Sequence, residues 1–314
     1  MNTIMSAIRT QGLSKDYRVG FWGRRLTVLR DVCLDIPAGE VFGYLGPNGA
    51  GKSTTIKLLL GLVQPTAGQA SVLGHPAGDV RARRHIGFLP ENPSFYEYLT
   101  GQEFLEFSGR LLGMTRSQLR DQVQRLLDDV GLGRAAGQQI RKYSKGMVQR
   151  LGLAQALLGD PKLLILDEPM SGLDPIGRKE VRDLILQQKI SGRTVFFSSH
   201  ILPDVEMICD RVGILVSGRV VRLGPIGELL GEDIESIEIT ASAVPPDVLQ
   251  VVEKCAIGPA LHLGNHVMLR LHGEAELDRV LPMLVEAKCR VLSVVPQRCS
   301  LEEIFLAASR ENGA

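Results

Sequence analysis

The chain has 314 residues, 44% of them hydrophobic and 23% charged, which is long enough for two domains and ordinary for a globular protein. A formal net charge of +1 gives no general attraction to nucleic acid, so no nucleic-acid partner is expected. The sequence has no signal-peptide segment and no apolar run near the ~20 residues of a membrane-spanning helix, and its five cysteines lack C-x-x-C spacing, so we expect a reduced cytoplasmic protein.

The N-terminal stretch predicts two strands, over residues 8–17 and 28–36. Tyr17 ends the first strand, and a polar, glycine-containing run follows it. An aromatic residue in that place could stack on an adenine ring. Taken alone, however, such a residue more often packs at the end of its strand.

The stretch GPNGAGKST fits the phosphate-loop pattern G-x-x-x-x-G-K-[ST]. Residues 40–45 before it predict a strand, and residues 54–60 predict a helix whose N-terminus points at the bound phosphates. Glycines let backbone N–H groups surround a polyphosphate closely. Lys52 would span the β- and γ-phosphates, and the Ser53 hydroxyl would ligate Mg²⁺. The expected nucleotide contacts are Gly46, Pro47, Asn48, Gly49, Ala50, Gly51, Lys52, Ser53 and Thr54.

The next segment changes from turns to helices. Residues 61–74 are rich in turn formers, and residues 86–90 predict a short buried strand that ends at Glu91. Two capping boxes follow, Thr100 with Glu103 and Thr115 with Gln118, and each precedes apolar residues at helical spacing. A helical insert therefore interrupts an α/β domain.

The stretch YSKGMVQR, residues 143–150, predicts a loop that turns into a helix with Ser144 as its N-cap. An open helix N-terminus formed by Ser144 and Gly146 could bind a second anion. An ordinary capped helix without a ligand is the more frequent reading of such a stretch.

The run LLILDEP ends a strand that is apolar on both faces with two carboxylates, as in a buried parallel sheet. Asp167 would hold Mg²⁺, directly or through water, and Glu168 would polarise the attacking water. A polar SGLD loop and a helix over 177–188 follow. Residues 194–199 predict another buried strand, which brings His200 to the same sheet edge and favours a functional role for it.

The C-terminal stretch 232–314 predicts a small α+β unit of its own. Strands are expected over 236–240, 267–271 and 291–295, a helix over 277–285, and a last helix capped by Ser300 and Glu303. A regulatory or dimer-supporting role is the sharper hypothesis for it, and an inert packing appendage is the alternative.

Taken together, GPNGAGKST, Glu91, YSKGMVQR, LLILDEP, SGLD and SSH resemble the motifs of ATP-binding cassette (ABC) ATPases over residues 7–230. The resemblance implies an α/β P-loop NTPase fold, a mixed sheet with a helical subdomain at about 92–160, and the cofactors ATP and Mg²⁺. It implies that Tyr17 stacks on adenine and that Lys52, Ser53 and Thr54 hold phosphates and Mg²⁺. It further places Asp167 in the metal site, Glu168 as the base, Asp174 at a dimer interface and His200 at the γ-phosphate.

Two departures from the commonest ABC pattern stand out. Glu91 takes the place of a Mg²⁺-sensing Gln, and YSKGM replaces LSGGQ, with Met147 at the Gln position and Lys145 adding charge. These changes are similar to those in the ABC-2 type exporter branch, which includes multidrug, daunorubicin, sodium and gliding-associated exporters. The ending SLEEIFL is similar to the accessory C-terminal domains of that branch.

The resemblance also implies partners. In this family the helix capped by Ser144 closes over the ATP of a second copy, so ATP-dependent dimerisation and slow hydrolysis by the monomer are expected. A separately encoded ABC-2 type permease would dock near Glu91, through Phe95, Tyr96 and Tyr98, unless these aromatics are buried in the helical insert. The chain would be peripheral on the cytoplasmic face of the inner or plasma membrane and soluble when isolated.

Two other classes share part of these motifs. Soluble ABC ATPases that act in translation or DNA maintenance usually carry two cassettes or a coiled-coil insertion, whereas this chain has one phosphate loop and one YSKGM. A P-loop kinase would not need the YSKGM helix or SSH. The exporter ATPase is therefore favoured.

Overall fold

The computed structural model describes residues 6–20, 23–230, 234–298 and 300–311. The chain forms two compact units, residues 1–226 with 305–314 and residues 227–304. This division differs from the predicted domains at the C-terminal end, because residues from Phe305 onward group with the first unit.

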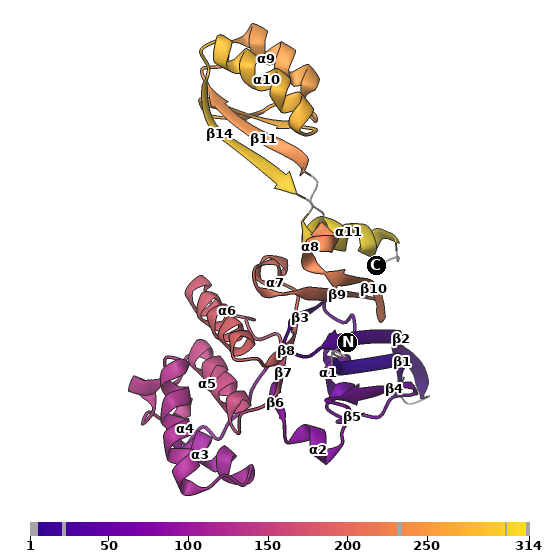
Figure 1. Ribbon diagram of the computed structural model, residues 1–314, viewed down its shortest axis with the longest axis vertical. Coiled ribbons are helices and arrows are strands. Elements are labelled where there is room, and N and C mark those ends of the chain that lie inside the picture. Colours follow the sequence, from indigo (N-terminus) through magenta and orange to yellow (C-terminus); the bar gives the residue numbers. More distant parts are fainter. Residues whose placement is uncertain (1–5, 21–22, 231–233, 299, 312–314) are drawn as a thin grey trace, which may run out of the picture. The chain divides into compact units, whose positions relative to one another are not determined.

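A six-stranded sheet forms the centre of the first unit, in the order β10-β9-β3-β8-β7-β6 (Figure 1). β3, β6, β7, β8 and β9 run parallel, and only β10 is antiparallel to its neighbour. The predicted mixed sheet is confirmed. The strands are β3 (Val41–Leu45), β6 (Ile86–Leu89), β7 (Leu163–Asp167), β8 (Thr194–Ser199), β9 (Arg211–Val216) and β10 (Arg219–Pro225).

A second, antiparallel sheet has the order β2-β1-β4-β5, with β1 (Ser6–Val19), β2 (Arg24–Pro37), β4 (Ala67–Val72) and β5 (His75–Pro76). The turn-rich stretch 61–74 also contains a strand, β4, which the sequence analysis did not predict. Only Val72 of β4 is buried, and the strand pairs with β1. Its place is thus set by pairing with a distant strand and not by a local apolar pattern.

Helix α1 (Lys52–Leu59) contributes its apolar face to the main core of this unit. Ile56 and Leu59 pack there with side chains from β1, β2, β3, β7 and β8. Phe42 and Phe196 stack in this core with ring centroids 5.7 Å apart. The phosphate loop therefore leads into a helix that is fixed between the two sheets.

Three helices form the predicted insert: α3 (Gly101–Leu111), α4 (Arg116–Asp129) and α5 (Lys145–Leu157), which lie together in Figure 1. Both predicted capping boxes are confirmed, at Thr100 with Glu103 and at Thr115 with Gln118. Short helical turns occur at Val80–Arg83 (α2), Gly133–Ala135 and Ile140–Lys142. Helices α6 (Pro175–Ile190) and α7 (Leu202–Ile208) also belong to the first unit, and α8 (Ile226–Leu230) begins at the boundary between the two units.

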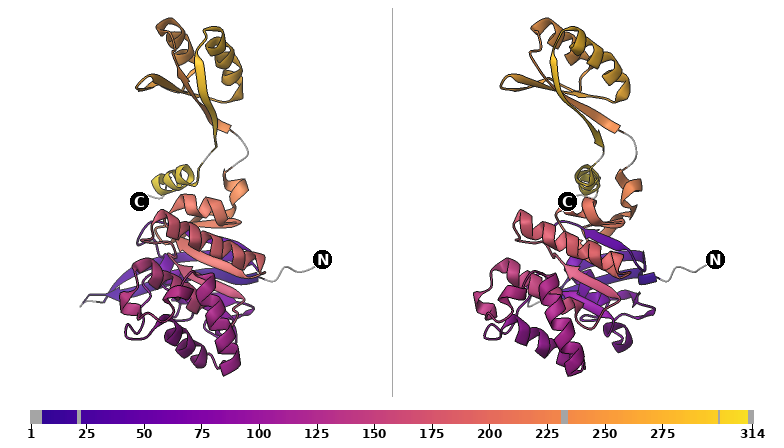
Figure 2. Two further views of the ribbon diagram at one scale, coloured as in Figure 1. Left: turned by 90° about the vertical axis from the view of Figure 1, so that its left-hand side faces the viewer. Right: turned by 60° about the vertical axis from the view of Figure 1, so that its left-hand side comes forward.

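The second unit is a four-stranded sheet in the order β12-β13-β11-β14, with two helices on one face (Figure 2). Val252 of α9 and Val280 and Leu284 of α10 pack against alternate residues of β11 and β13, such as Ile239 and Leu269. The bounds are β11 (Ile234–Ser242), α9 (Pro246–Val252), a turn at Glu253–Cys255, β12 (Leu261–Leu263), β13 (His266–Leu271), α10 (Glu274–Glu286) and β14 (Arg290–Arg298). Helix α11 (Leu301–Glu311) begins at the predicted cap, where the Glu303 N–H donates to Ser300 Oγ.

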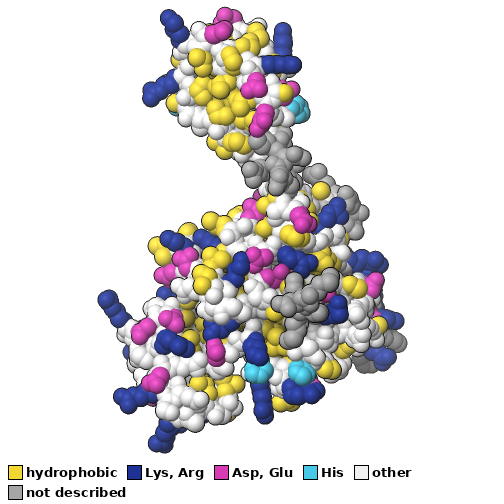
Figure 3. Space-filling model, in the orientation of Figure 1, with side chains coloured by type: hydrophobic (Ala, Val, Ile, Leu, Met, Phe, Trp, Pro, Cys, Tyr) yellow, Lys and Arg dark blue, Asp and Glu magenta, His cyan; other side chains and the backbone are white. Residues whose placement is uncertain are grey.

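Acidic and basic side chains are interspersed in the view of Figure 3, as the small net charge suggests. Within the described part of the chain, no helix is both long enough and apolar enough to cross a bilayer.

Glu40 lies just before β3, at the opposite end of that strand from the phosphate loop. Its side chain is only 14% exposed, and its Oε1 accepts no hydrogen bond from the described residues, although Arg211 Nη1 lies 3.5 Å away. Burial, together with nearby Asp210, raises the pKa of Glu40 to about 7 from an ordinary value of 4.5, while Arg211 opposes this shift. Glu40 therefore lowers stability once it ionises in the folded protein.

We expect Glu40→Gln to raise the free energy of unfolding at pH 8 by about 2 kcal/mol. The unfolded carboxyl ionises above pH 4.5 and the folded one only near pH 7, so the parent loses stability across this window as pH rises and the amide does not. The gain should vanish below pH 4.5, which urea unfolding at several pH values would measure. An equal gain at pH 4 and pH 8 would contradict this account.

Candidate functional site

The phosphate loop joins the end of β3 to the start of α1, and two of its glycines are sterically required. A Cβ at Gly46 would lie 2.5 Å from the carbonyl oxygen of Leu215. Gly51 has φ +112°, and a Cβ there would lie 2.6 Å from Leu29 Cδ2. Any larger side chain would therefore displace the loop from β9 and β2.

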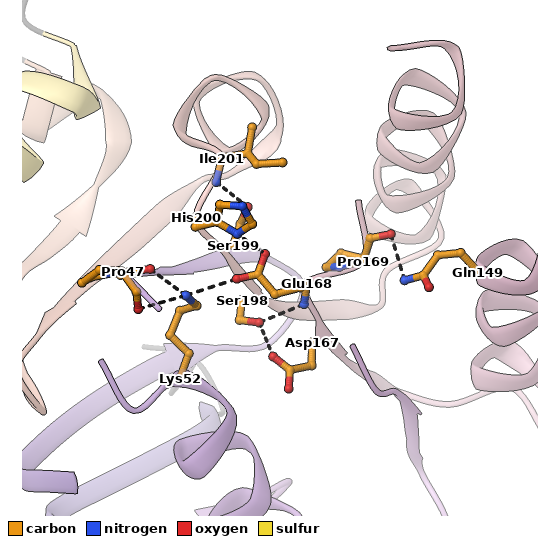
Figure 4. A network of polar contacts seen from close by, with 11 residues as sticks. Pro47, Lys52, Gln149, Asp167, Glu168, Pro169, Ser198, Ser199, His200 and Ile201 are labelled. Carbon is orange, nitrogen blue, oxygen red and sulfur yellow. Dashed lines mark hydrogen bonds and ion pairs between the residues drawn. The ribbon is translucent and has the colours of Figure 1, made fainter. Parts of the chain in front are cut away.

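Lys52, Glu168 and His200 form a connected polar group at the carboxyl ends of β3, β7 and β8 (Figure 4). Lys52 Nζ donates to the carbonyl oxygen of Gly46 at 2.6 Å and lies 3.1 Å from Glu168 Oε1. Glu168 Oε2 lies 2.8 Å from His200 Nδ1. Lys52 and Glu168 are each about 6% exposed, whereas the His200 side chain is 45% exposed. A buried carboxylate thus links the loop lysine to a histidine at the surface.

Asp167 and Glu168 are consecutive, but their surroundings differ. Asp167 ends β7 in the parallel register, opposite Ser198 of β8, and its Oδ1 accepts the Ser198 hydroxyl at 2.6 Å. Glu168 has φ +49°, in the left-handed region, which turns the chain sharply at the end of the strand. This turn brings Glu168 over the phosphate loop although it follows directly after Asp167.

A cavity of about 540 Å³ lies over the phosphate loop. It brings together many of the predicted site residues: Pro47, Asn48, Gly49, Gly51, Lys52, Ser53, Thr54, Glu91, Glu168 and His200. Val28 and Ser171 also line it, and the sequence did not single them out. Asp167 is not among the residues that line the cavity, although the next residue, Glu168, is.

Ser144, Gly146 and Asp174 line a different groove, of about 370 Å³, with Lys145 and Gly172. Within this chain Ser144 Oγ accepts the Met147 N–H at 3.3 Å, and Asp174 Oδ1 accepts the Gly177 N–H at 2.9 Å. Both side chains are therefore N-caps, of α5 and α6. One chain does not bring these residues into the cavity over the phosphate loop.

Tyr17 lies outside the residues that line the cavity. It pairs with Leu26 of β2, and Lys15 Nζ lies 5.0 Å from the centre of its ring. Its proposed contact with adenine stays a prediction.

The sequence analysis gave no role to Ser198 or to Gln149. Gln149 is buried in α5, and its amide donates to the carbonyl oxygen of Pro169 at 3.1 Å, which ties α5 to the segment after Glu168. The available signal for Ser198 was a polar residue within a buried apolar stretch, whereas no comparable signal marks Gln149. The stretch that contains Ser198 is TVFFSS, which is wholly buried.

Comparison with known proteins agrees with this geometry. A sequence profile described as ABC transporter matches residues 29–171. The chain is 41% identical over 313 residues to an uncharacterized ABC transporter ATP-binding protein of Synechocystis sp., covering 98% of this chain and 86% of the relative. It is 36% identical over 277 residues to the bacitracin transport ATP-binding protein BcrA of Bacillus licheniformis, covering 87% and 89%.

Among solved structures, the dimeric post-hydrolysis state of the ATP-binding cassette MJ0796, bound to ADP and Pi, has a TM-score of 0.65 at 25% identity. The match covers 70% of this chain and 99% of the cassette. These findings confirm the predicted fold class and the predicted ATP-hydrolysing activity. With its phosphate loop, its sheet order and these relatives, the chain belongs to the family of ABC transporter ATP-binding proteins.

Proposed function

We propose that this chain is the ATP-hydrolysing subunit of an ABC-2 type exporter, in which two cassettes drive a separately encoded membrane permease. The observation that carries the proposal is the cavity over the phosphate loop, which gathers Lys52, Ser53, Glu91, Glu168 and His200 from four segments. The departures at Glu91 and in YSKGM support the ABC-2 branch, and BcrA, a relative named for bacitracin transport, supports transport.

Mg²⁺ fits the donors at this site. Ser53 and Glu91, which line the cavity, offer a hydroxyl and a carboxylate, and Asp167, next to Glu168, offers a second carboxylate. These are the hard oxygen ligands that Mg²⁺ prefers. Asp167 is buried, and its orientation is fixed by Ser198. The ion would offset phosphate charge when it is bound with ATP.

The remaining roles follow from the contacts of the chain itself. Lys52, which has Glu168 as its partner here, would turn to the phosphates when nucleotide binds. Glu168 would then be free to accept the proton of the attacking water, while His200 holds the other carboxylate oxygen. The ion pair between Lys52 and Glu168 therefore keeps the base occupied until ATP arrives.

The separation of the two sites supports the proposed pairing with a second copy. Ser144 and Gly146 at the N-terminus of α5, with Lys145, present N–H groups and positive charge at a groove away from the chain's own phosphate loop. A second copy in antiparallel orientation would place this groove over the bound ATP, and two identical sites would form.

The surface near Glu91 is the proposed permease contact. Tyr96 and Tyr98 are 50% and 67% exposed, with ring centroids 5.9 Å apart, and Tyr96 also contacts Phe107 edge-on at 5.7 Å. Phe95 instead packs on Phe104 at 4.5 Å, so we remove it from the proposed docking surface. Exposed aromatic side chains that lie together are typical of protein interfaces.

We expect the double change Tyr96→Ala and Tyr98→Ala to reduce membrane association at least 10-fold when the chain is co-expressed with its permease, because each truncated aromatic anchor costs ~1–2 kcal/mol. ATP binding by the isolated chain should not change. Ile190→Ala, which removes an 85% exposed apolar residue from the end of α6, is the matched control. Unchanged recovery of the double variant in membrane fractions would count against this docking surface.

The alternative, a cassette that acts in translation or DNA maintenance, is not favoured. The relatives reported above are transporter proteins, and each match extends over more than four-fifths of the relative.

A further inference from the structure

Ser198 is a hydroxyl buried between the two acidic residues of the site. It is 0% exposed on β8, and its Oγ makes two hydrogen bonds to consecutive residues of β7 and the turn after it (Figure 4). It donates to Asp167 Oδ1 at 2.6 Å and accepts the Glu168 N–H at 3.0 Å. One hydroxyl therefore contacts both a carboxylate and the backbone of its neighbour.

The strand register explains why this position suits a small hydroxyl. Asp167 and Ser198 are partners in the parallel ladder between β7 and β8. The next residue, Glu168, leaves the ladder in the left-handed region, with φ +49°, which is uncommon for a residue other than glycine. Its buried N–H then needs an acceptor outside the ladder, and Ser198 Oγ supplies one.

We propose that Ser198 is a positioning residue for ATP hydrolysis, whose hydroxyl sets the orientation of the Asp167 carboxylate toward the metal and holds the turn that presents Glu168. The inference rests on the proposed role of Asp167 in the metal site. Partners that orient a metal-ligating side chain commonly change metal affinity when they are removed. A residue that only fills the strand would leave metal affinity unchanged.

The test measures metal binding separately from turnover. Mn²⁺ binding to the full chain, in the presence of a non-hydrolysable ATP analogue, is followed by electron paramagnetic resonance. Ser198→Ala should weaken Mn²⁺ binding about 10- to 100-fold. Binding of the analogue in EDTA should stay within about twofold of the parent, because Ser198 does not line the phosphate loop cavity. Ser198→Thr, which keeps the hydroxyl, should recover most of the Mn²⁺ affinity.

Ser199→Ala is the matched control. Ser199 is also buried on β8, but its Oγ accepts the Ile201 N–H at 3.0 Å and makes no hydrogen bond to either acid. Parent-like Mn²⁺ affinity in Ser198→Ala, or an equal loss in Ser199→Ala, would overturn the inference. If Ser198→Ala does not fold, Ser198→Cys keeps a weaker donor of similar size. Weakened Mn²⁺ binding by folded Ser198→Cys supports the inference, and parent-like binding overturns it.

Asp167→Asn separates this inference from the function on which it rests. If Asp167→Asn weakens Mn²⁺ binding and Ser198→Ala does not, only the role of Ser198 fails. If Asp167→Asn leaves Mn²⁺ binding unchanged, the metal site proposed at Asp167 fails, and the inference fails with it.

Discussion

Glu168→Gln is expected to lower the turnover number about 10²- to 10⁴-fold while ATP still binds, since general acid–base catalysis typically contributes an effect of this size. The amide keeps the size of the side chain and a possible contact with His200, which now lies 2.8 Å from Glu168 Oε2. It cannot accept a proton from water. ATP should then persist at the site and hold two copies together, so the variant should sediment as a dimer in ATP and as a monomer without it.

Glu106→Gln provides a matched control for this experiment. Glu106 lies on α3 and forms a surface pair with Arg110 at 3.6 Å, a kind of pair that contributes little to stability. Its turnover and its sedimentation should equal those of the parent. Parent-like steady-state hydrolysis by Glu168→Gln would remove Glu168 from the role of base. A Glu168→Gln variant that stays monomeric at saturating ATP would contradict the pairing of two cassettes.

Features that depend on residues close together in the sequence were predictable. The phosphate loop, the strand that ends in Asp167 and the caps at Thr100 and Thr115 each depend on residues within about eight positions of one another. The sequence runs of β7 and β8 are apolar on both faces, which is typical of parallel strands, and β3, β7 and β8 do run parallel. The proximity of Lys52 and Glu168 was therefore predictable from the sequence, because the carboxyl ends of parallel strands meet at one edge of the sheet.

Features that depend on distant partners were not predictable. Gly68 of β4 has φ +75°, and a Cβ there would lie 2.2 Å from the carbonyl oxygen of Gly12, so the residue that resembles a turn former is required by contact with β1. The left-handed turn at Glu168 is similar, since no glycine marks it and Ser198, 30 positions later, accepts its N–H. At Gly68 the close approach of β1 requires a glycine, whereas at Glu168 a residue other than glycine adopts a backbone conformation that such residues rarely take.

The functional site likewise has features that the sequence predicts and features that only the folded chain determines. The sequence predicted the phosphate-loop residues and the cap of α5 at Ser144. It did not predict that Asp174 caps α6, nor that these two groups of residues line separate cavities, which the geometry of the folded chain determines. Resemblance to ABC ATPases implied the second copy, and the placement of Ser144 and Asp174 as N-caps away from Lys52 is the physical basis for proposing it.

Lys52→Ala is expected to weaken ATP binding about 10- to 100-fold, because a hydrogen bond from a charged donor contributes about 1.5–3 kcal/mol and Lys52 is proposed to reach two phosphates. Hydrolysis should fall further, since phosphoryl transfer depends mainly on positioning and charge stabilisation. Equilibrium binding of a fluorescent ATP analogue and steady-state hydrolysis would measure the two effects. Lys57→Ala is the control, because Lys57 lies on the same helix with its side chain exposed.

The ion pair between Lys52 and Glu168 gives this prediction a second, separable part. Lys52→Ala removes the cation 3.1 Å from Glu168 Oε1 and leaves a carboxylate buried in the protein, so the nucleotide-free variant should also be less stable. Adding Glu168→Gln removes the buried charge, and the double variant should regain stability without regaining ATP binding. Recovery of both properties together would mean that Lys52 acts only as the partner of Glu168, whereas recovery of stability alone assigns the phosphates to Lys52.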